Sequence, residues 1–250
     1  MIRVVLIGAG GRMGQEVMRS SQEFPDLKIV GGVERKDHQD FGRRYYSLES
    51  FSGRFDCAVD FSTPEATISS LSFLVKEEKP VVIGTTGFDA KTQKGIEHAA
   101  LKIPIFLSPN MAYGMNLLID WIPAVLKNLP DFDIEMIEIH HKYKKDAPSG
   151  TVRRIIDRIK TVRPELKKIS GRSGPTGPRR RDEIGVFALR GGDVYGVHKL
   201  YLLGPGEEIT ITHRASSRSA FAFGALRAVR FITLQKPGLY AMEDLIQWAP

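Results

Sequence analysis

The feature that most constrains the fold is a glycine-rich turn near the start of the chain. It follows a short apolar run, Ile2 to Ile7, and reads Gly8-Ala9-Gly10-Gly11-Arg12-Met13-Gly14. A helix-compatible segment (15–24) and a second apolar run (28–33) ending at Glu34 come next. This order predicts a βαβ unit whose turn brings backbone N–H groups and a helix N-terminus to a pyrophosphate. Because Met13 replaces the last glycine of the strict GxGxxG pattern, the turn fits the looser GxxGxxG form.

The residues after the second strand bear on which dinucleotide binds. Glu34 would accept hydrogen bonds from the adenosine ribose hydroxyls, which favours NAD. Arg35 and Lys36 would hold a 2′-phosphate, which favours NADP. Because the two signals conflict, we expect both NADH and NADPH to serve as cofactors.

Strands and helices continue to alternate as far as about residue 111. Strands are expected over 55–61, 80–83 and 103–107, with a helix beginning near Pro64 and another ending near Leu101. Ligands of such doubly wound sheets bind beyond the carboxyl ends of the strands. Simple turn chemistry would also explain Thr85-Thr86-Gly87, but its place at a strand end favours cofactor contact. The residues expected to bind the cofactor are Gly8, Ala9, Gly10, Gly11, Arg12, Met13, Glu34, Arg35, Gly84, Thr85, Thr86, Ser108, Pro109, Asn110 and Met111.

The pattern changes after a long helical segment at 112–129. A strand at 133–141 and one helix precede three strands, 183–189, 195–203 and 208–213, with no helix between them. The turns between these strands contain Gly191-Gly192-Asp193 and Gly204-Pro205-Gly206, both typical of hairpins. We therefore expect an α/β chain: an N-terminal Rossmann domain, 1–111 completed by 219–250, and a second α+β domain, 112–218, on a mixed, mostly antiparallel sheet. A long flexible loop is expected at 170–181.

Composition excludes several classes of protein. With 250 residues, 42% of them hydrophobic and 26% charged, the chain reads as an ordinary soluble globular protein. Cys57 is the only cysteine, which excludes a disulfide framework within the chain and a cysteine-based metal site; we expect no metal. No apolar stretch reaches the ~18 residues of a membrane span, and Met1 to Ile7 do not resemble a signal peptide. A cytoplasmic location is expected, without membrane contact.

The formal charge is +7, and much of the excess falls between Arg153 and Arg181. Acids are few in that stretch, chiefly Asp157 and Glu165. Such a run is found in nucleic-acid-binding proteins, on solvated helix faces and near sites for polyanionic metabolites. No aromatic residues alternate with these charges. We therefore expect anionic small molecules as partners and no nucleic acid.

The densest group of reactive residues is the segment His140-His141-Lys142-Tyr143-Lys144-Lys145-Asp146-Ala147-Pro148-Ser149-Gly150-Thr151. It begins where an alternating strand ends, so the two histidines are expected on opposite faces. It ends where a helix begins, with Ser149 or Thr151 as the capping residue and the Gly150 and Thr151 N–H groups available to an anion. A basic surface loop before a helix cap would explain any one of these residues. Together they predict a proton donor beside a site for a carboxylate.

The motifs resemble those of the 4-hydroxy-tetrahydrodipicolinate reductase (dihydrodipicolinate reductase) family, of the diaminopimelate route to lysine. The resemblance covers nearly the whole chain and is most specific at His140 to Thr151. The other matching segments are Gly8 to Gly14, Asp60-Phe61-Ser62-Thr63-Pro64, Gly84-Thr85-Thr86-Gly87, Ser108-Pro109-Asn110, Leu189-Arg190-Gly191-Gly192, His213 with Ser217-Arg218, and Lys236-Pro237-Gly238-Leu239-Tyr240.

The resemblance implies hydride transfer from NADPH or NADH to a cyclic dicarboxylate imine, followed by protonation of the adjacent ring carbon. It implies that His140 is the acid/base and that Lys144 donates a proton and contacts the substrate. It further implies that His141, Gly150 and Thr151 bind substrate. Ser149, the capping residue, and Arg218 are further candidates for substrate binding. The resemblance also implies a homotetramer joined through the sheet of the second domain.

Two other hypotheses remain. One is another two-domain Rossmann oxidoreductase acting on an amino-acid-like substrate, which would lack an anion site beside paired histidines. The other is a non-catalytic protein that senses a dinucleotide or binds nucleic acid, which the basic run suggests; a steep salt dependence of DNA binding would support it.

Overall fold

The computed structural model describes residues 1–34, 44–45 and 47–248. The chain divides into two compact units: unit 1 is Met1–Tyr113 with Arg218–Pro250, and unit 2 is Gly114–Ser217. Unit 2 is thus inserted between two segments that together make unit 1. In the part of the chain described, no helix is both long enough and apolar enough to cross a membrane.

Unit 1 is built on a parallel sheet of seven strands in the order β12-β6-β5-β4-β1-β2-β3. The strands are β1 (Ile2–Ile7), β2 (Leu27–Val33), β3 (Arg44–Tyr45), β4 (Cys57–Asp60), β5 (Val81–Ile83), β6 (Pro104–Leu107) and β12 (Gly238–Tyr240). The helices are α1 (Arg12–Ser20), α2 (Pro64–Lys76), α3 (Ala90–Ala100), α6 (Ser219–Ile232) and α7 (Met242–Gln247), with single 3₁₀ turns η1 (Ser21–Glu23) and η2 (Leu48–Ser50). The expected Rossmann domain is confirmed.

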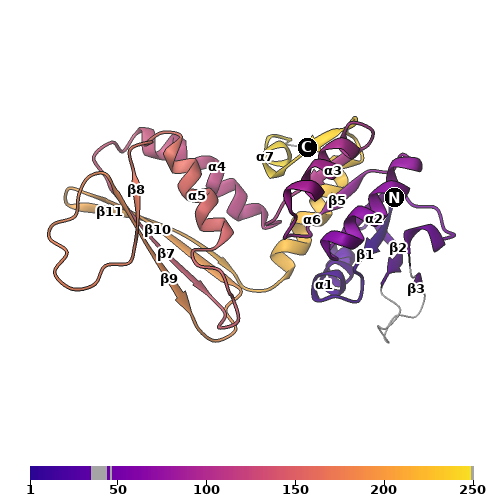
Figure 1. The fold of residues 1–250 in the computed structure, drawn as a ribbon, viewed down its shortest axis with the longest axis horizontal. Coiled ribbons are helices and arrows are strands. Elements are labelled where there is room, and N and C mark those ends of the chain that lie inside the picture. Colours follow the sequence, from indigo (N-terminus) through magenta and orange to yellow (C-terminus); the bar gives the residue numbers. More distant parts are fainter. Residues whose placement is uncertain (35–43, 46, 249–250) are drawn as a thin grey trace. The chain divides into compact units, whose positions relative to one another are not determined.

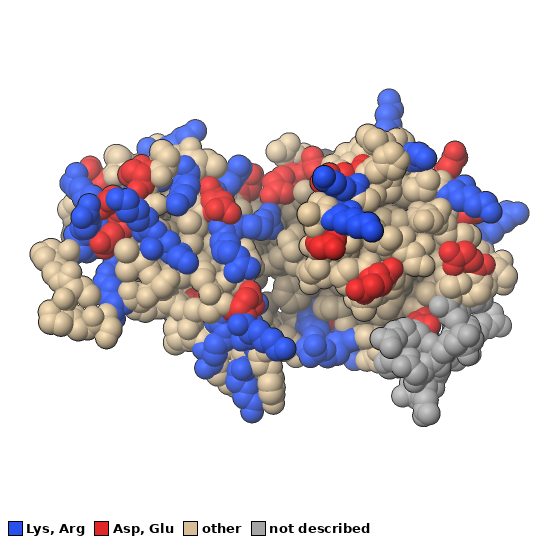
Figure 2. Space-filling model, in the orientation of Figure 1, with Lys and Arg blue, Asp and Glu red and all other residues tan. Residues whose placement is uncertain are grey.

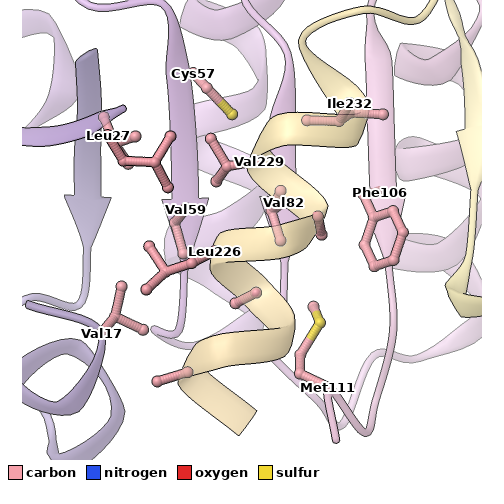
Figure 3. Packing of buried hydrophobic residues seen from close by; sticks show 14 of the residues in the cluster. Val17, Leu27, Cys57, Val59, Val82, Phe106, Met111, Leu226, Val229 and Ile232 are labelled. Carbon is pink, nitrogen blue, oxygen red and sulfur yellow. The ribbon is translucent and has the colours of Figure 1, made fainter. Parts of the chain in front are cut away.

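The side chains of β1 point alternately to the two faces of this sheet and pack into two hydrophobic cores, one on each face. Val4 and Leu6 belong to a cluster that includes α1, α6 and α7, whereas Val5 and Ile7 pack with residues of α2 and α3. Helix α6 lies across the first face, with Leu226, Val229 and Ile232 near the side chains of the central strands (Figure 3). Cys57 is buried in this core, and burial raises the pKa of its thiol, which makes it unreactive.

Unit 2 has a five-stranded sheet in the order β11-β10-β7-β9-β8. The strands are β7 (Asp133–His140), β8 (Lys167–Ser170), β9 (Glu183–Arg190), β10 (Gly196–Gly204) and β11 (Glu207–Ala215). Helices α4 (Tyr113–Lys127) and α5 (Gly150–Lys160) lie on one face of it (Figure 1). The expected mixed sheet is confirmed: β10 pairs with β7 and β11 in antiparallel orientation, and β9 pairs with β7 and β8 in parallel.

Of the two predicted hairpins, the one at Gly204 is confirmed and the one at Gly191-Gly192 is wrong. Gly204 pairs with Glu207 at the turn between β10 and β11, as expected. The Gly191-Gly192 turn, in contrast, does not join neighbouring strands, because β7 lies between β9 and β10. The backbone of this turn forms hydrogen bonds with the end of β7 and with the loop that follows it. Gly191 N–H donates to His140 O at 3.0 Å, and Lys142 N–H donates to Gly192 O at 3.1 Å.

Several arginines of the basic run, residues 153–181, form ion pairs with acids that lie outside this run. Arg158 binds Asp120 at 2.8 Å, and Arg172 and Arg179 both bind Glu135 on β7. Arg172 and Arg179, which belong to the expected flexible loop, therefore bind an acid of the sheet and are not available to an anionic ligand. Figure 2 shows acidic side chains set among the basic ones of this unit. The expectation that the run attracts anions is thus weakened for these residues.

Candidate active site

Strand β7 places His140 on the helix-covered face of unit 2. Burial alternates along the strand, so that Ile134, Met136, Glu138 and His140 are buried, whereas the residues between them are only half-buried. His140 is the last residue of the strand and is 8% exposed. His141, the next residue, is half-buried.

Helix α5 begins beside the end of this strand. Its N-cap is Ser149, whose Oγ accepts from Val152 N–H at 3.3 Å, so the first of the two expected capping residues fills the position. Gly150 begins the helix and is exposed, as an anion site at this terminus requires. Arg153, one turn into the helix, donates to Pro148 O at 2.7 Å and adds a cation near the same terminus.

The strand and the helix are joined by Glu138, a residue that no sequence motif singles out. Its side chain is fully buried, and its Oε1 accepts from Ser149 N–H and from the Arg190 guanidinium, both at 3.0 Å. Its Oε2 lies 3.4 Å from His140 Nδ1 and 3.9 Å from Nε2 of His198, on β10. One carboxylate therefore contacts the strand end, the helix start and both neighbouring strands.

The two histidines of this cluster are neutral at neutral pH. Burial lowers the pKa of His140 to about 4, and the cations of Lys144 and Arg190 act in the same direction, against the opposing effect of Glu138. Burial, together with His140, lowers the pKa of His198 to about 4. Burial would raise the pKa of Glu138, but the hydrogen bonds from Ser149 and Arg190 outweigh it and lower the value. Glu138 is thus a buried anion.

Lys144 lies in the loop between β7 and α5. Its Nζ forms an ion pair with Asp146 at 2.8 Å, and its N–H donates to His141 O at 3.1 Å, which closes a turn. Its charge affects His140 and His198, so the amine lies within electrostatic range of both rings. The structure thus brings together His140, His141, Lys144, Ser149, Gly150 and Thr151 at one strand-to-helix junction.

Gly196 leaves room beside the catalytic candidate. A methyl group at this position on β10 would lie 3.3 Å from His140 Nε2 and 3.7 Å from the His198 ring. The Nε2 edge of His140 therefore faces a stretch of backbone without a side chain. Arg218, in contrast, is not among the residues gathered here, because it stands at the N-cap of α6 in unit 1.

The glycine-rich turn of unit 1 has the close packing that a dinucleotide requires. Gly8 has φ +78°, and a methyl group there would lie 2.6 Å from Phe61 O. A methyl group at Gly14 would lie 2.3 Å from Gly8 O. Gly8 and Ala9 N–H donate to Val33 O, and Gly11 N–H to Gly8 O. Because helical hydrogen bonding starts from Gln15 N–H, the amides of Arg12 and Met13 precede it and offer the seat for a phosphate.

Glu34 reaches this turn, as its place at the end of β2 predicts. Its Oε2 accepts from Gly10 N–H at 2.6 Å, which puts the carboxylate beside the expected pyrophosphate position. Arg35 and Lys36 lie outside the described residues.

Two more strand ends are tied together by a buried acid. Asp60 Oδ1 accepts from Ser62 N–H at 2.9 Å, from Ser62 Oγ at 2.5 Å and from Thr85 Oγ at 3.1 Å. Burial raises the pKa of Asp60, and the hydrogen bonds oppose that shift. The turn after β4 and the turn after β5 are thus held at fixed spacing. Gly84 is required there, because a methyl group would lie 2.1 Å from the Phe61 ring.

The segment after β6 divides between surface and core. Pro109 is exposed and Asn110 half-buried, and Ser108 Oγ donates to Asn110 O at 2.9 Å. The prediction that Met111 binds the cofactor is wrong for its side chain. That side chain is 2% exposed and packs in the core under α6 (Figure 3). An apolar side chain of that length fills the interior there because Gly224 lets α6 approach the Met111 backbone.

Both parts of the chain match known proteins. Residues 2–111 match the family model described as dihydrodipicolinate reductase, N-terminus, and residues 114–246 match its C-terminus counterpart. The 4-hydroxy-tetrahydrodipicolinate reductase of Caldanaerobacter subterraneus subsp. tengcongensis is 42% identical over 248 residues, covering 99% of each chain. That of Aquifex aeolicus is 39% identical over 262 residues, covering 98% of each.

Solved structures show the same fold. A dihydrodipicolinate reductase from Paenisporosarcina sp. TG-14, with dipicolinate bound, superposes with a TM-score of 0.82 at 25% identity, covering 98% of this chain and 99% of that one. A diaminopimelate dehydrogenase from C. glutamicum has a TM-score of 0.58 at 13% identity, covering 100% and 96%, and shares the fold alone. Both halves of the chain match the same family model, and curated relatives match along nearly its whole length, so the chain belongs to the dihydrodipicolinate reductase family.

Proposed function

We propose that this chain reduces 4-hydroxy-tetrahydrodipicolinate to tetrahydrodipicolinate with NADH or NADPH, in the diaminopimelate route to lysine. The observation that supports the proposal most is the junction of β7 and α5, where His140 and Lys144 lie beside a helix N-terminus. The activity named for the curated relatives is the same. The Paenisporosarcina relative binds dipicolinate, a planar dicarboxylate of the expected kind.

The substrate is a dianion, and unit 2 offers groups that bind carboxylates. The N–H groups of Gly150 and Thr151, at the start of α5, and the side chains of Lys144 and His141 are the proposed ligands, with Ser149 as the cap that holds the helix start. These groups orient the substrate ring.

The reaction adds a hydride and a proton to the substrate ring, and the 4-hydroxyl group of the substrate leaves as water. The nicotinamide of the bound cofactor supplies the hydride. We assign the proton to the pair His140 and Lys144. With its pKa at about 4, His140 is neutral in the free protein, but two substrate carboxylates nearby would favour its protonated form. Lys144, already an ammonium paired with Asp146, is the second donor.

The cofactor is assigned to unit 1. The amides at the start of α1 would bind the pyrophosphate and Glu34 the ribose hydroxyls. Gly84, Thr85 and Thr86, with Ser108, Pro109 and Asn110, would line the remaining strand ends. The cradle at Gly8 and Gly14, which a methyl group would fill, supports this assignment.

We also propose that the protein is a cytoplasmic homotetramer assembled through unit 2. The face of its sheet opposite α4 and α5 carries Ile137, Ile139, Phe187 and Leu189, and Leu189 is 46% exposed. An uncovered apolar sheet face of this kind is typical of a surface that binds another copy. Polar and charged residues, among them Lys199, Thr210 and Thr212, lie on the same face.

The decisive experiment is oxidation of NADPH and of NADH, side by side, in the presence of freshly generated pathway intermediate. Turnover with either cofactor is expected, and the ratio of kcat/KM values gives the preference. Lys144→Ala and His140→Ala should lower kcat by about 10²-fold or more while the affinity for cofactor is retained. Absence of turnover with both cofactors would reject the proposal, and unchanged turnover in both variants would reject the assigned roles.

A further inference from the structure

Glu138 is buried in unit 2, and its two carboxylate oxygens face different groups. Oε1 accepts two hydrogen bonds, from Ser149 N–H and from Arg190. These bonds prevent the carboxylate from turning, because both donors are themselves held, Ser149 by the start of α5 and Arg190 by its second bond to Asp146 O at 2.6 Å. Oε2 is therefore held facing the His140 ring.

Glu138 Oε2 and His140 Nδ1 are complementary. Among the described residues, each of these buried atoms lacks a hydrogen-bond partner, and they lie 3.4 Å apart. Only a proton on Nδ1 would satisfy both, since a carboxylate accepts and does not donate. The opposite ring nitrogen, Nε2, would then be the proton-accepting atom, on the edge that faces Gly196.

The geometry points to Glu138 as a positioning residue that holds the Nδ1–H tautomer of His140 and stabilises the imidazolium formed when Nε2 is protonated. The inference rests on the proposed function, because it concerns the group that protonates the substrate. In that step the Nε2–H bond breaks, its electron pair stays on the ring, and the proton forms the new C–H bond at the substrate carbon. A buried carboxylate plays the same part for the histidine of serine proteases.

The same group of side chains resembles a metal site in composition. One donor atom from each of Glu138, His140 and His198 lies within 4.8 Å of the others. However, Arg190 lies 3.0 Å from the same carboxylate, and a guanidinium next to a divalent cation is unfavourable. The positioning role therefore agrees better with the charges that surround Glu138.

The variant that tests the inference is Glu138→Gln. Its amide oxygen can still accept from Ser149 and Arg190, so the helix start is retained. Its amide nitrogen would donate to His140 Nδ1 and so favour the wrong tautomer. We expect kcat to fall by about 10²-fold or more, with less than threefold change in the Kd for dipicolinate and for NADPH.

Glu135→Gln is the matched control. Glu135 lies on the same strand but on the opposite face, where it binds Arg172 and Arg179. Its loss should lower the thermal midpoint without lowering kcat. If the two variants lose kcat equally, Glu138 is merely structural and the inference is overturned.

A double variant separates a role exerted through His140 from any other. Adding Glu138→Gln to His140→Ala should lower kcat no further, because the ring that Glu138 positions is absent. A multiplicative loss in the double variant would overturn the inference.

A readout independent of turnover separates failure of this inference from failure of the proposed function. In ¹⁵N-imidazole NMR spectra of the full chain, His140 should show a protonated Nδ1, and Glu138→Gln should move the proton to Nε2. An Nε2–H ring in the unaltered protein would overturn the inference whether or not the substrate is reduced. Tight Zn²⁺ binding that Glu138→Gln abolishes would identify a metal site instead.

Discussion

Ser149 N–H donates a 3.0 Å hydrogen bond to Glu138 Oε1, so the cap of α5 is fixed to the carboxylate that faces His140. The anion site and the acid/base candidate are thereby parts of one hydrogen-bonded unit. A change at the helix cap should therefore affect both stability and substrate binding.

Ser149→Ala removes the Oγ that accepts from Val152 N–H. The free energy of unfolding should fall by about 1 kcal/mol, and the Kd for dipicolinate should rise, because the helix start loses its anchor. Urea unfolding and calorimetric titration measure the two effects. Asp89→Ala removes the cap of α3, which accepts from Thr92 N–H at 2.7 Å in unit 1. It should show a similar loss of stability with dipicolinate binding intact; equal weakening in both variants would contradict the role of Ser149.

Gly8→Ala should weaken cofactor binding at least about tenfold. The new methyl group would lie 2.6 Å from Phe61 O at a φ of +78°, so the turn must move away from the phosphate seat. Fluorescence titration with NADH and NADPH checks this, and dipicolinate binding should persist. Gly206→Ala is the control, because it shares a positive φ of +77° but meets nothing within 4 Å. A variant at Gly8 that binds both cofactors normally would remove the turn from the cofactor site.

Stability should fall as the pH drops from about 6.5 towards 4. The pKa values of His140 and His198 are about 4 in the folded protein, below the ordinary value of 6.5. In that window the unfolded chain binds more protons than the folded one, so the free energy of unfolding rises with pH. Glu138, with its lowered pKa, adds to the loss at the acidic end.

The pH effect belongs to a defined set of groups. Those acting on His140 are Glu138, Lys144, Arg190 and Asp146, while His140 itself acts on His198. Urea unfolding at pH 7.5, 6 and 5 measures the slope, which His198→Asn should reduce. His98→Asn, at an exposed position on α3, should leave it unchanged. Equal slopes in all three proteins would contradict the assignment.

Asp60→Ala should destabilise unit 1 by about 2–3 kcal/mol and weaken cofactor binding. It removes the carboxylate that accepts from the half-buried Ser62 hydroxyl and from the buried Thr85 hydroxyl. Asp56→Ala is the comparison, because Asp56 binds Arg3 near the surface and should cost less. Thermal unfolding of both variants, with and without NADH, gives the two quantities. A smaller loss at Asp60 than at Asp56 would show that the strand-end link is unimportant.

Leu189→Glu should dissociate the proposed tetramer. It places a charge on the uncovered face of the unit 2 sheet, in the register of Ile139 on β7. Sedimentation velocity measures the mass. Leu234→Glu changes a leucine in unit 1 that is 70% exposed, and should leave the mass unaltered. An unaltered tetramer in Leu189→Glu would place the interface elsewhere.

Local patterns predicted most elements because their signals are short-range. The run at 2–34 combines an apolar strand, glycines and a helical segment, and β1, α1 and β2 fall where that order puts them. The tail was expected to return to unit 1, and β12 does pair with β6 there. However, β12 and β8 are too short to be recognised as strands.

Features set by long-range pairing could not be predicted in the same way. The Gly191-Gly192 turn looks like a hairpin until β7 is known to lie between the strands that it connects. Asp120, which binds Arg158, and Glu135, which binds Arg172 and Arg179, lie more than 30 residues from these arginines, so the pairing is not visible in the local sequence.

The sequence does contain a signal for the burial of Glu138. Glu135 and Glu138 are an odd number of residues apart on one strand, so they must point to opposite faces. Because helices cover one face of the sheet, one of the two acids has to be buried. Glu138 lies two residues before His140, so it is the acid on the same face of the strand as that ring. Which groups would compensate its charge depended on β9 and α5 and was not visible.

The placement of α6 and α7 has a consequence for biosynthesis. The core of unit 1 includes Ala222, Leu226, Val229 and Leu245, which are made after all of unit 2. On the ribosome, one face of the sheet formed by the first 113 residues is therefore covered only in part, by α1, at a time when residues 114–217 can already fold. Nascent unit 1 is the part most in need of a chaperone, and a truncation before residue 219 should leave it insoluble.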